Sequence, residues 1–92
     1  MENKDRNRLF ELYQKIREFK KNLDGDAKTI LQEFDYFIGL YNIKSDKDKL
    51  LTRLMFDNAK NWFIEGNKHK NIEYVERSLD GMIEWDNKIG LS

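Results

Sequence analysis

Histidine, a residue type much used in catalysis and metal binding, occurs once in this 92-residue chain, as His69 between Lys68 and Lys70. General acid–base catalysis or zinc binding needs further His, Glu, Asp or Cys side chains at set spacings. The chain has no cysteine, no His-Glu-x-x-His motif, no Glu-x-x-His pair and no glycine-rich phosphate loop. We therefore expect His69 to be an exposed loop residue, in a protein that is not an enzyme and binds no metal or cofactor.

Acidic residues follow one another at intervals of three or four in the last quarter of the chain, at Glu73, Glu76, Asp80 and Glu84. On a helix this spacing places them on one face. Such a face suggests a cation site. A solvated face opposite a basic helix explains the same pattern and is the commoner arrangement.

Large aromatic residues make partner binding the better interpretation. One helix face cannot bury three consecutive residues, so at least one of Trp62, Phe63 and Ile64 must meet something other than its own core. A second line at helical spacing contains Tyr74, Ser78, Gly81 and Trp85. Exposed aromatic residues often anchor interfaces. Trp62 and Trp85 can equally complete a small core, and both interpretations remain open.

The basic cluster Lys68-His69-Lys70 follows this apolar segment. It is either an ordinary surface loop or a contact for anionic lipid headgroups or an acidic protein surface. Near a charged membrane each Lys contributes about 1 kcal/mol. The candidate partner-binding residues are Trp62, Ile64, Lys68, His69, Lys70, Tyr74 and Trp85.

Composition limits the class of protein. The chain is 39% hydrophobic and 37% charged with a formal net charge of zero, which suits one domain and disfavours nucleic-acid binding. It has no run near the ~20 apolar residues that span a bilayer. Met1 to Arg8 are almost wholly polar, so no signal peptide is expected. We expect a cytoplasmic protein that is a monomer or a weak dimer.

Four segments carry apolar residues at the helical spacing i, i+3, i+4, i+7, which predicts helices over about 5–22, 26–42, 46–65 and 71–88. Short connections favour antiparallel neighbours. The predicted fold of the single domain, 1–92, is an all-α, antiparallel up-and-down four-helix bundle. The apolar positions expected to face its core are Leu9, Leu12, Tyr13, Ile16, Phe19, Leu23, Ala27, Ile30, Leu31, Phe34, Phe37, Ile38, Tyr41, Leu51, Leu54, Met55, Ala59, Trp62, Phe63, Ile72, Val75, Leu79, Met82, Ile83 and Ile89.

The formal charges of the four segments alternate in sign. Residues 1–23 hold seven Lys/Arg and four Asp/Glu, and residues 24–43 hold one and four. Residues 44–70 again hold seven and four, and residues 71–92 hold two and five. In an up-and-down bundle each segment then meets neighbours of opposite sign, which favours this topology although exposed ion pairs contribute only about 0–1 kcal/mol each.

Glycine, aspartate and serine mark the expected turns, since the chain has no proline. In Asp24-Gly25-Asp26, Gly25 suits a left-handed helix end and either aspartate suits the start of the next helix. Ser45 is expected to cap the third helix, which should end at Glu65-Gly66, and residues 66–70 should form a loop. Gly39, inside the second helix, indicates close approach of a neighbouring helix. Gly90 suits the end of the fourth.

Several short segments resemble the immunity proteins of class IIa (pediocin-like) bacteriocins, particularly the enterocin A immunity group. Leu12-Tyr13-Gln14-Lys15-Ile16 is similar to the family's early Leu-Tyr-x-x-Ile segment, and Asp26 to Phe34 is similar to the start of its second helix. Leu50-Leu51-Thr52-Arg53-Leu54 is similar to the opening of its third helix, and the spacing to Ile72–Leu79 also fits.

The resemblance implies a cytosolic four-helix bundle that protects a Gram-positive producer from its own bacteriocin. The family acts at the mannose phosphotransferase membrane receptor once the bacteriocin has engaged it. Recognition is attributed to the C-terminal helical hairpin, which here contains all seven candidate residues.

Two departures from the family bear on this interpretation. Many relatives have a proline before the third helix, where this chain has Ser45-Asp46, and many extend beyond the fourth helix. We therefore expect the fourth helix itself to supply specificity. A small regulatory or adaptor module, of antitoxin or phage type, that binds a soluble protein partner remains the alternative function.

Overall fold

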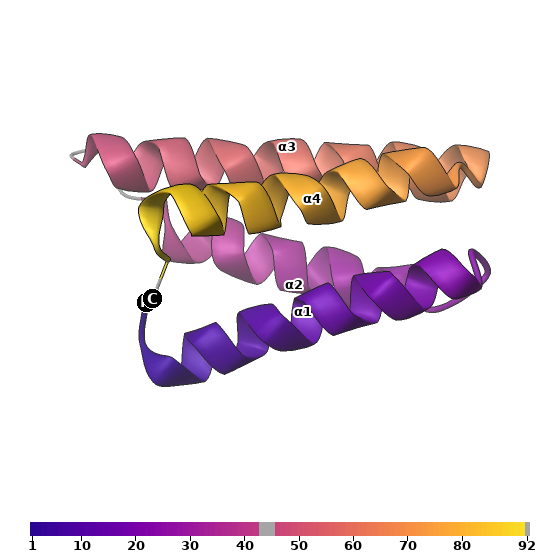
Figure 1. The fold of residues 1–92 in the computed structure, drawn as a ribbon, viewed down its shortest axis with the longest axis horizontal. Coiled ribbons are helices and arrows are strands. Elements are labelled where there is room, and N and C mark those ends of the chain that lie inside the picture. Colours follow the sequence, from indigo (N-terminus) through magenta and orange to yellow (C-terminus); the bar gives the residue numbers. More distant parts are fainter. Residues whose placement is uncertain (43–45, 92) are drawn as a thin grey trace.

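The computed structural model describes residues 1–42 and 46–91. Within these residues the chain forms four helices, α1 (Asn3–Lys21), α2 (Ala27–Leu40), α3 (Lys47–His69) and α4 (Ile72–Ile89). Consecutive helices run in opposite directions (Figure 1), and the start of α1 lies beside the end of α4, where Arg6 pairs with Asp86. The contacting pairs are α1–α2, α2–α3, α3–α4 and α1–α4. The predicted antiparallel up-and-down four-helix bundle is confirmed.

The core faces of α1 and α2 follow the predicted apolar stripes. On α1 the buried members are Leu9, Leu12, Tyr13, Ile16 and Phe19, and on α2 they are Ile30, Phe34 and Phe37. The remaining predicted positions on α2 and Leu23 are half-buried against this core. Both helices therefore have the predicted register.

The first half of α3 has a different register from the predicted one. Leu51 and Leu54 are exposed, Leu54 to 46%, whereas Phe56 is fully buried. Phe56 stacks on Phe37 of α2 with ring centroids 5.2 Å apart. Thr52 is buried, and its hydroxyl donates to the carbonyl of Asp48 at 2.8 Å. The buried hydroxyl therefore keeps a hydrogen-bond partner. The prediction that Leu51 and Leu54 face the core is wrong, because aromatic packing across helices selects the neighbouring face.

The two ends of α4 also differ from the prediction. Val75, Leu79 and Met82 are buried, but Ile72 and Ile89 are exposed. Ile72 is the first residue of the helix. At the other end Gly90 adopts φ +65°, as predicted, and turns the chain so that Leu91 is buried instead of Ile89.

The α3–α4 connection is shorter than the predicted loop over residues 66–70. α3 continues through Gly66 to His69, and the chain reverses at Lys70, which has φ 50° and ψ 44°. Gly66 lies so close to α4 that an added Cβ would be 2.6 Å from Val75 Cγ2 and 2.9 Å from its backbone nitrogen. The prediction that α3 ends at this glycine is wrong, because the glycine permits close helix contact instead.

The other turn residues divide between confirmed and wrong predictions. Asp26 caps α2 by accepting from the Thr29 backbone N–H at 3.1 Å, as predicted. Gly25 is not left-handed, since positive φ is confined to Lys70 and Gly90 in the described part of the chain. Gly39 does not contact a neighbouring helix, because nothing lies within 4 Å of an added Cβ. Ser45 lies outside the described residues, and Asp46 caps α3.

Ion pairs join helices of opposite charge. Arg8 pairs with Glu33 between α1 and α2 at 2.6 Å, and Lys60 pairs with Asp35 between α3 and α2 at 2.5 Å. The α1–α4 pairs are Arg6–Asp86 at 2.7 Å and Lys20–Glu76 at 3.3 Å. The prediction that neighbouring segments meet with opposite sign is confirmed. Among residues 1–42 and 46–91, no helix is long and apolar enough to cross a membrane.

Candidate functional site

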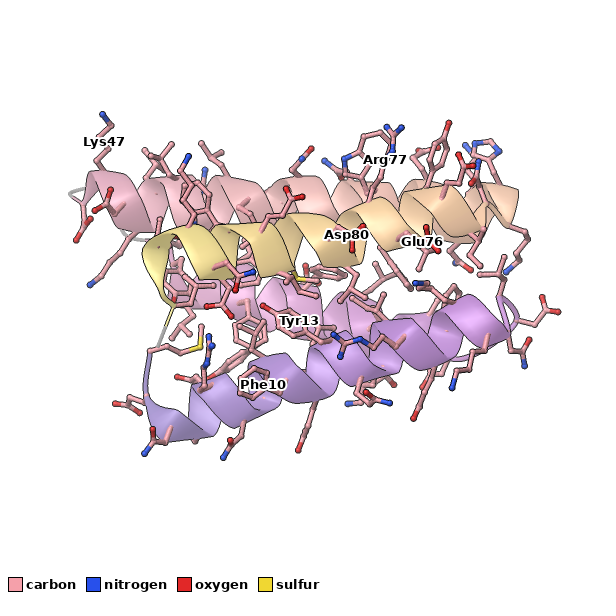
Figure 2. The ribbon with its side chains drawn as sticks, in the orientation of Figure 1. Phe10, Tyr13, Lys47, Glu76, Arg77 and Asp80 are labelled. Atoms are coloured by element: carbon pink, nitrogen blue, oxygen red, sulfur yellow. The ribbon has the colours of Figure 1, made fainter. Side chains whose placement is uncertain are left out.

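The outer side of the α3–α4 hairpin carries an aromatic cluster, which we call the Trp62 cluster (Trp62, Tyr74 and Arg77). The ring centroids of Trp62 and Tyr74 are 5.3 Å apart, and the Arg77 guanidinium carbon lies 4.9 Å from the Trp62 ring centroid. Tyr74 and Arg77 share one side of α4 because they are three residues apart. Both aromatic side chains are half-buried and Arg77 is exposed. Figure 2 shows Arg77 over the α3–α4 pair.

A groove of about 300 Å³ continues from this cluster between α3 and α4. Its lining includes Ala59, Trp62 and Gly81. The Ser78 hydroxyl donates to the Ala59 carbonyl at 2.6 Å and holds the two helices together beneath the groove. Nothing lies within 4 Å of the place where a Gly81 Cβ would be. The groove is therefore open at residue 81.

Two carboxylates, Asp80 and Glu84, also line the groove. Both are exposed, and neither forms an ion pair with any described residue. Glu76, in contrast, pairs with Lys20 of α1. No group of three or more His, Cys, Asp or Glu suitable for a metal ion occurs within the described residues. The geometry of the acidic series fits a solvated face.

Trp85 lies farther along the same α3–α4 seam. Its indole N–H donates to Thr52 Oγ1 at 3.0 Å, and Lys88 Nζ lies 5.9 Å from its ring centroid. Eleven residues separate it from Tyr74, or about 16 Å along a helix. Trp85 is half-buried and ties α4 to α3, so it borders the candidate surface but lies apart from the Trp62 cluster.

The predicted basic residues do not form one loop. Lys68 and His69 are the last residues of α3, and His69 Nε2 lies 3.1 Å from Glu65 Oε2 on the same helix. Lys70 Nζ donates to the Leu23 carbonyl at 2.7 Å, which fastens the hairpin to the α1–α2 connection. Ile64 is exposed but lies about 200° around the helix from Trp62. Of the seven predicted residues, the structure brings Trp62 and Tyr74 into contact.

Arg77 and the open groove are the features that sequence reasoning missed. The three-residue spacing from Tyr74 to Arg77 was the available signal for the stacked guanidinium. Gly81 was recognised as part of the second line, but its open surroundings depend on which α3 residues face it.

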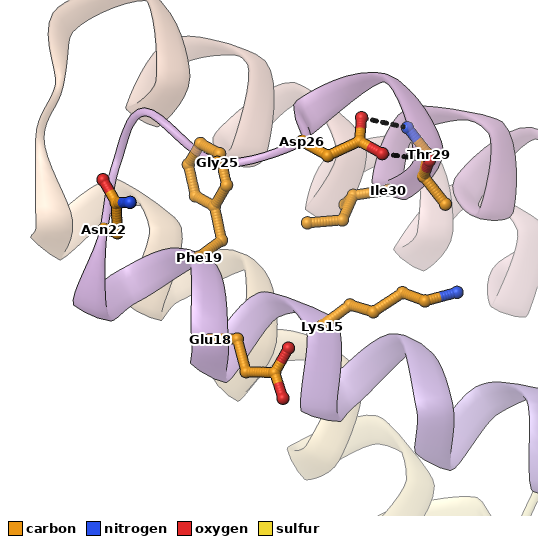
Figure 3. Close-up of a pocket in the computed structure, with 8 residues that line it drawn as sticks. All are labelled: Lys15, Glu18, Phe19, Asn22, Gly25, Asp26, Thr29 and Ile30. Atoms are coloured by element: carbon orange, nitrogen blue, oxygen red, sulfur yellow. Dashed lines mark hydrogen bonds between the residues drawn. The ribbon is translucent and has the colours of Figure 1, made fainter.

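A second hollow, of about 290 Å³, lies between the end of α1 and the start of α2 (Figure 3). Phe19 and Ile30 form its buried apolar wall. The Asp26 carboxylate at its edge accepts from both the side chain and the backbone of Thr29, and these hydrogen bonds hold the pKa of Asp26 below its ordinary value. Since this carboxylate already caps α2, we interpret the hollow as part of the connection between α1 and α2 and not as a binding site.

Buried polar residues gather at the end of the bundle where α1 begins and α4 ends. Asp86 Oδ1 accepts from Arg6 Nη1 at 2.7 Å and from the Leu91 N–H at 3.1 Å. The Tyr36 hydroxyl donates to buried Asp5. The Tyr13 hydroxyl, which lies between α1 and α4 in Figure 2, is buried without a hydrogen-bond partner among the described residues. These contacts join α1 to α2 and α4.

In comparisons with known proteins, no family model, curated sequence or solved structure matches the chain. Function must therefore be inferred from the α3–α4 surface together with the sequence resemblance.

Proposed function

We propose that this chain is a bacteriocin immunity protein of the class IIa type, without enzymatic activity. It acts from the cytosol and protects its producer through the α3–α4 hairpin, at the bacteriocin-engaged mannose phosphotransferase receptor. The observation that supports this proposal is the Trp62 cluster beside an open groove. It lies on the hairpin to which the resemblance attributes recognition.

The chemistry of the Trp62 cluster suits a binding surface. Trp, Tyr and Arg are the residues most often found at energetically dominant interface positions. Contacts with the Trp62 ring hold the Tyr74 and Arg77 side chains in place, and only Lys70 and Asn71 separate α3 from α4. A surface ordered before binding loses less conformational entropy when the partner arrives.

A protection assay tests the proposal. The chain is expressed in a sensitive indicator strain, which is challenged with a panel of pediocin-like bacteriocins. We expect selective survival against one or two peptides, and at least tenfold weaker protection for Trp62→Ala, because truncating an interface anchor costs about 2 kcal/mol or more.

Phe10→Ala is the matched control for this variant. Phe10 is an exposed aromatic residue on α1 with the Arg6 guanidinium 4.7 Å from its ring centroid, so its surroundings resemble those of Trp62. We expect Phe10→Ala to leave protection unchanged, with the helicity of both variants checked by circular dichroism. Killing by every peptide, with folded protein in the cytosol, would contradict the proposal and favour an adaptor that binds a soluble partner.

A further inference from the structure

The α3 side of the groove between α3 and α4 is mainly apolar, and the α4 side carries two carboxylates and one guanidinium. On α3 the lining residues are Met55, Ala59 and Trp62, with the polar Asn58 between them. On α4, Asp80 and Glu84 flank Gly81. A surface of this kind complements a helix that is apolar on one side and basic on the other.

The charges of α4 differ between its two sides. The carboxylates that face α1, Glu76 and Asp86, are paired with Lys20 and Arg6. Asp80 and Glu84 have no basic partner within the part of the chain that the structure describes. The basic residue of the groove lining, Arg77, lies over the Trp62 ring. The groove therefore offers two carboxylates to a cationic partner.

Gly81 allows a partner to approach the α4 backbone. Ala59 and Gly81 are the smallest lining residues, and the space above Gly81 is empty. Helices pack at shorter axial distances where small residues meet. Gly66, by contrast, is covered by Val75, so packing inside the bundle accounts for a glycine at that position. No residue of the bundle packs against Gly81 in the same way.

We propose that the α3–α4 groove binds a cationic amphipathic helical segment of the partner protein, with its basic side over Asp80 and Glu84 and its apolar side against Trp62 and Met55. The biological identity of that partner rests on the proposed function. The chemistry of the segment follows from the groove itself.

Calorimetric titration of the full chain with a synthetic amphipathic helix tests this inference. The probe has leucines on one face, lysines on the other and a length of about five turns. The control peptide replaces every lysine with glutamate. We expect the lysine peptide to bind at least tenfold more tightly than the control and to weaken as salt is raised, because the exposed carboxylates are screened.

Gly81→Leu should fill the groove and weaken binding of the lysine peptide at least tenfold. Gly39→Leu is the matched control, because Gly39 is also within a helix and open above its Cα, but lies outside the groove. We expect Gly39→Leu to bind within twofold of the unmodified chain. Asp80→Asn combined with Glu84→Gln should remove most of the salt dependence.

Several outcomes would overturn the inference: no binding, equal binding of both peptides, or equal effects of the two glycine variants. The proposed function is judged separately by the protection assay. Groove-dependent peptide binding without protection would contradict the immunity role alone. Protection that survives Gly81→Leu, with no peptide binding, would contradict the groove alone.

Discussion

Individual polar residues inside the bundle determine how α1 is held to its neighbours. Asp86 accepts hydrogen bonds from Arg6 of α1 and from the Leu91 backbone N–H. Hydrogen bonds to a charged group contribute about 1.5–3 kcal/mol each when they are shielded from water. The Tyr13 hydroxyl, one helical turn from Leu9 and Ile16, has no such partner among the described residues. Among the described residues Arg53 Nε is likewise buried without a hydrogen-bond partner, so the Tyr13 hydroxyl is one of two unsatisfied places in the bundle.

Replacing Tyr13 with Phe should stabilise the protein by about 1 kcal/mol at neutral pH, because it removes a buried hydroxyl with no partner. Urea unfolding followed by circular dichroism measures the change. Tyr36→Phe is the contrasting variant, since it leaves buried Asp5 without its donor. It should be less stable than the unmodified chain. A less stable Tyr13→Phe variant would show that this hydroxyl has a partner in solution.

The same tyrosine makes stability depend on alkaline pH. Burial raises the pKa of Tyr13 above its ordinary value, and the negative charge of Asp86 adds to the shift. The unfolded chain releases this proton near pH 10 while the folded chain keeps it. Ionisation of Tyr13 in the unfolded chain therefore leaves the free energy of unfolding unchanged below about pH 10 and lowers it as the pH rises further. Unfolding free energies measured on both sides of about pH 10 should fall less steeply for Tyr13→Phe.

At the scale of the helices, two glycines that both lie inside a helix have different roles. Gly39 and Gly66 both lie inside helices, yet only Gly66 touches a neighbouring helix. In a helix interior glycine is less favourable than alanine by about 0.8–1 kcal/mol. At Gly66 the close approach of Val75 offsets that cost, whereas at Gly39 nothing does.

Gly66→Ala and Gly39→Ala should therefore have opposite effects. Gly66→Ala forces its Cβ against Val75 and should destabilise by about 1–3 kcal/mol. Gly39→Ala should stabilise by about 0.5–1 kcal/mol. Thermal unfolding resolves this difference, because 1 kcal/mol shifts the Tm by about 4–8 °C in a domain of this size. Stabilisation by both substitutions would show that α4 moves to accommodate the new methyl group.

The accuracy of the sequence prediction varied with the helix. On α1 and α2 one apolar stripe is clear, and its register was predicted. α3 begins with apolar residues on several sides, including Leu51, Leu54 and Phe56. Local periodicity allows two registers there, and packing of Phe56 on α2 selects one. Trp62 and Tyr74 were predicted as site residues. The groove could not be predicted, because it depends on the empty space above Gly81 and on how α3 and α4 pack, which the apolar pattern of one helix does not show.

For the whole molecule, alternating segment charge is the feature that distinguishes this arrangement of helices from its alternatives. The cross-helix ion pairs join α1 or α3 to α2 or α4. A bundle with α1 beside α3 would place two basic helices together. Each repulsive contact between two such helices would raise the free energy of the fold only slightly, but the contacts would recur along the length of the helices.

Charge reversal across α2 and α3 tests this arrangement. Lys60→Glu alone should destabilise by up to about 1 kcal/mol, because it faces Asp35 and both positions are partly exposed. Adding Asp35→Lys should restore most of the loss, and high salt should reduce both effects. A double-mutant cycle of urea unfolding free energies measures the coupling. A coupling free energy of zero, with Asp35→Lys alone as the fourth member of the cycle, would show that the pair contributes nothing.

The positions of the tryptophans have an optical consequence. The chain has two, Trp62 and Trp85, and both contact the opposite helix across the α3–α4 seam. Excitation that is selective for indole therefore gives emission from the α3–α4 seam alone, because α1 and α2 contain no tryptophan. Intrinsic fluorescence of the unlabelled protein is then a built-in reporter of the seam: a ligand that settles beside Trp62 should alter the emission, and one that binds near the α1–α2 hollow should not.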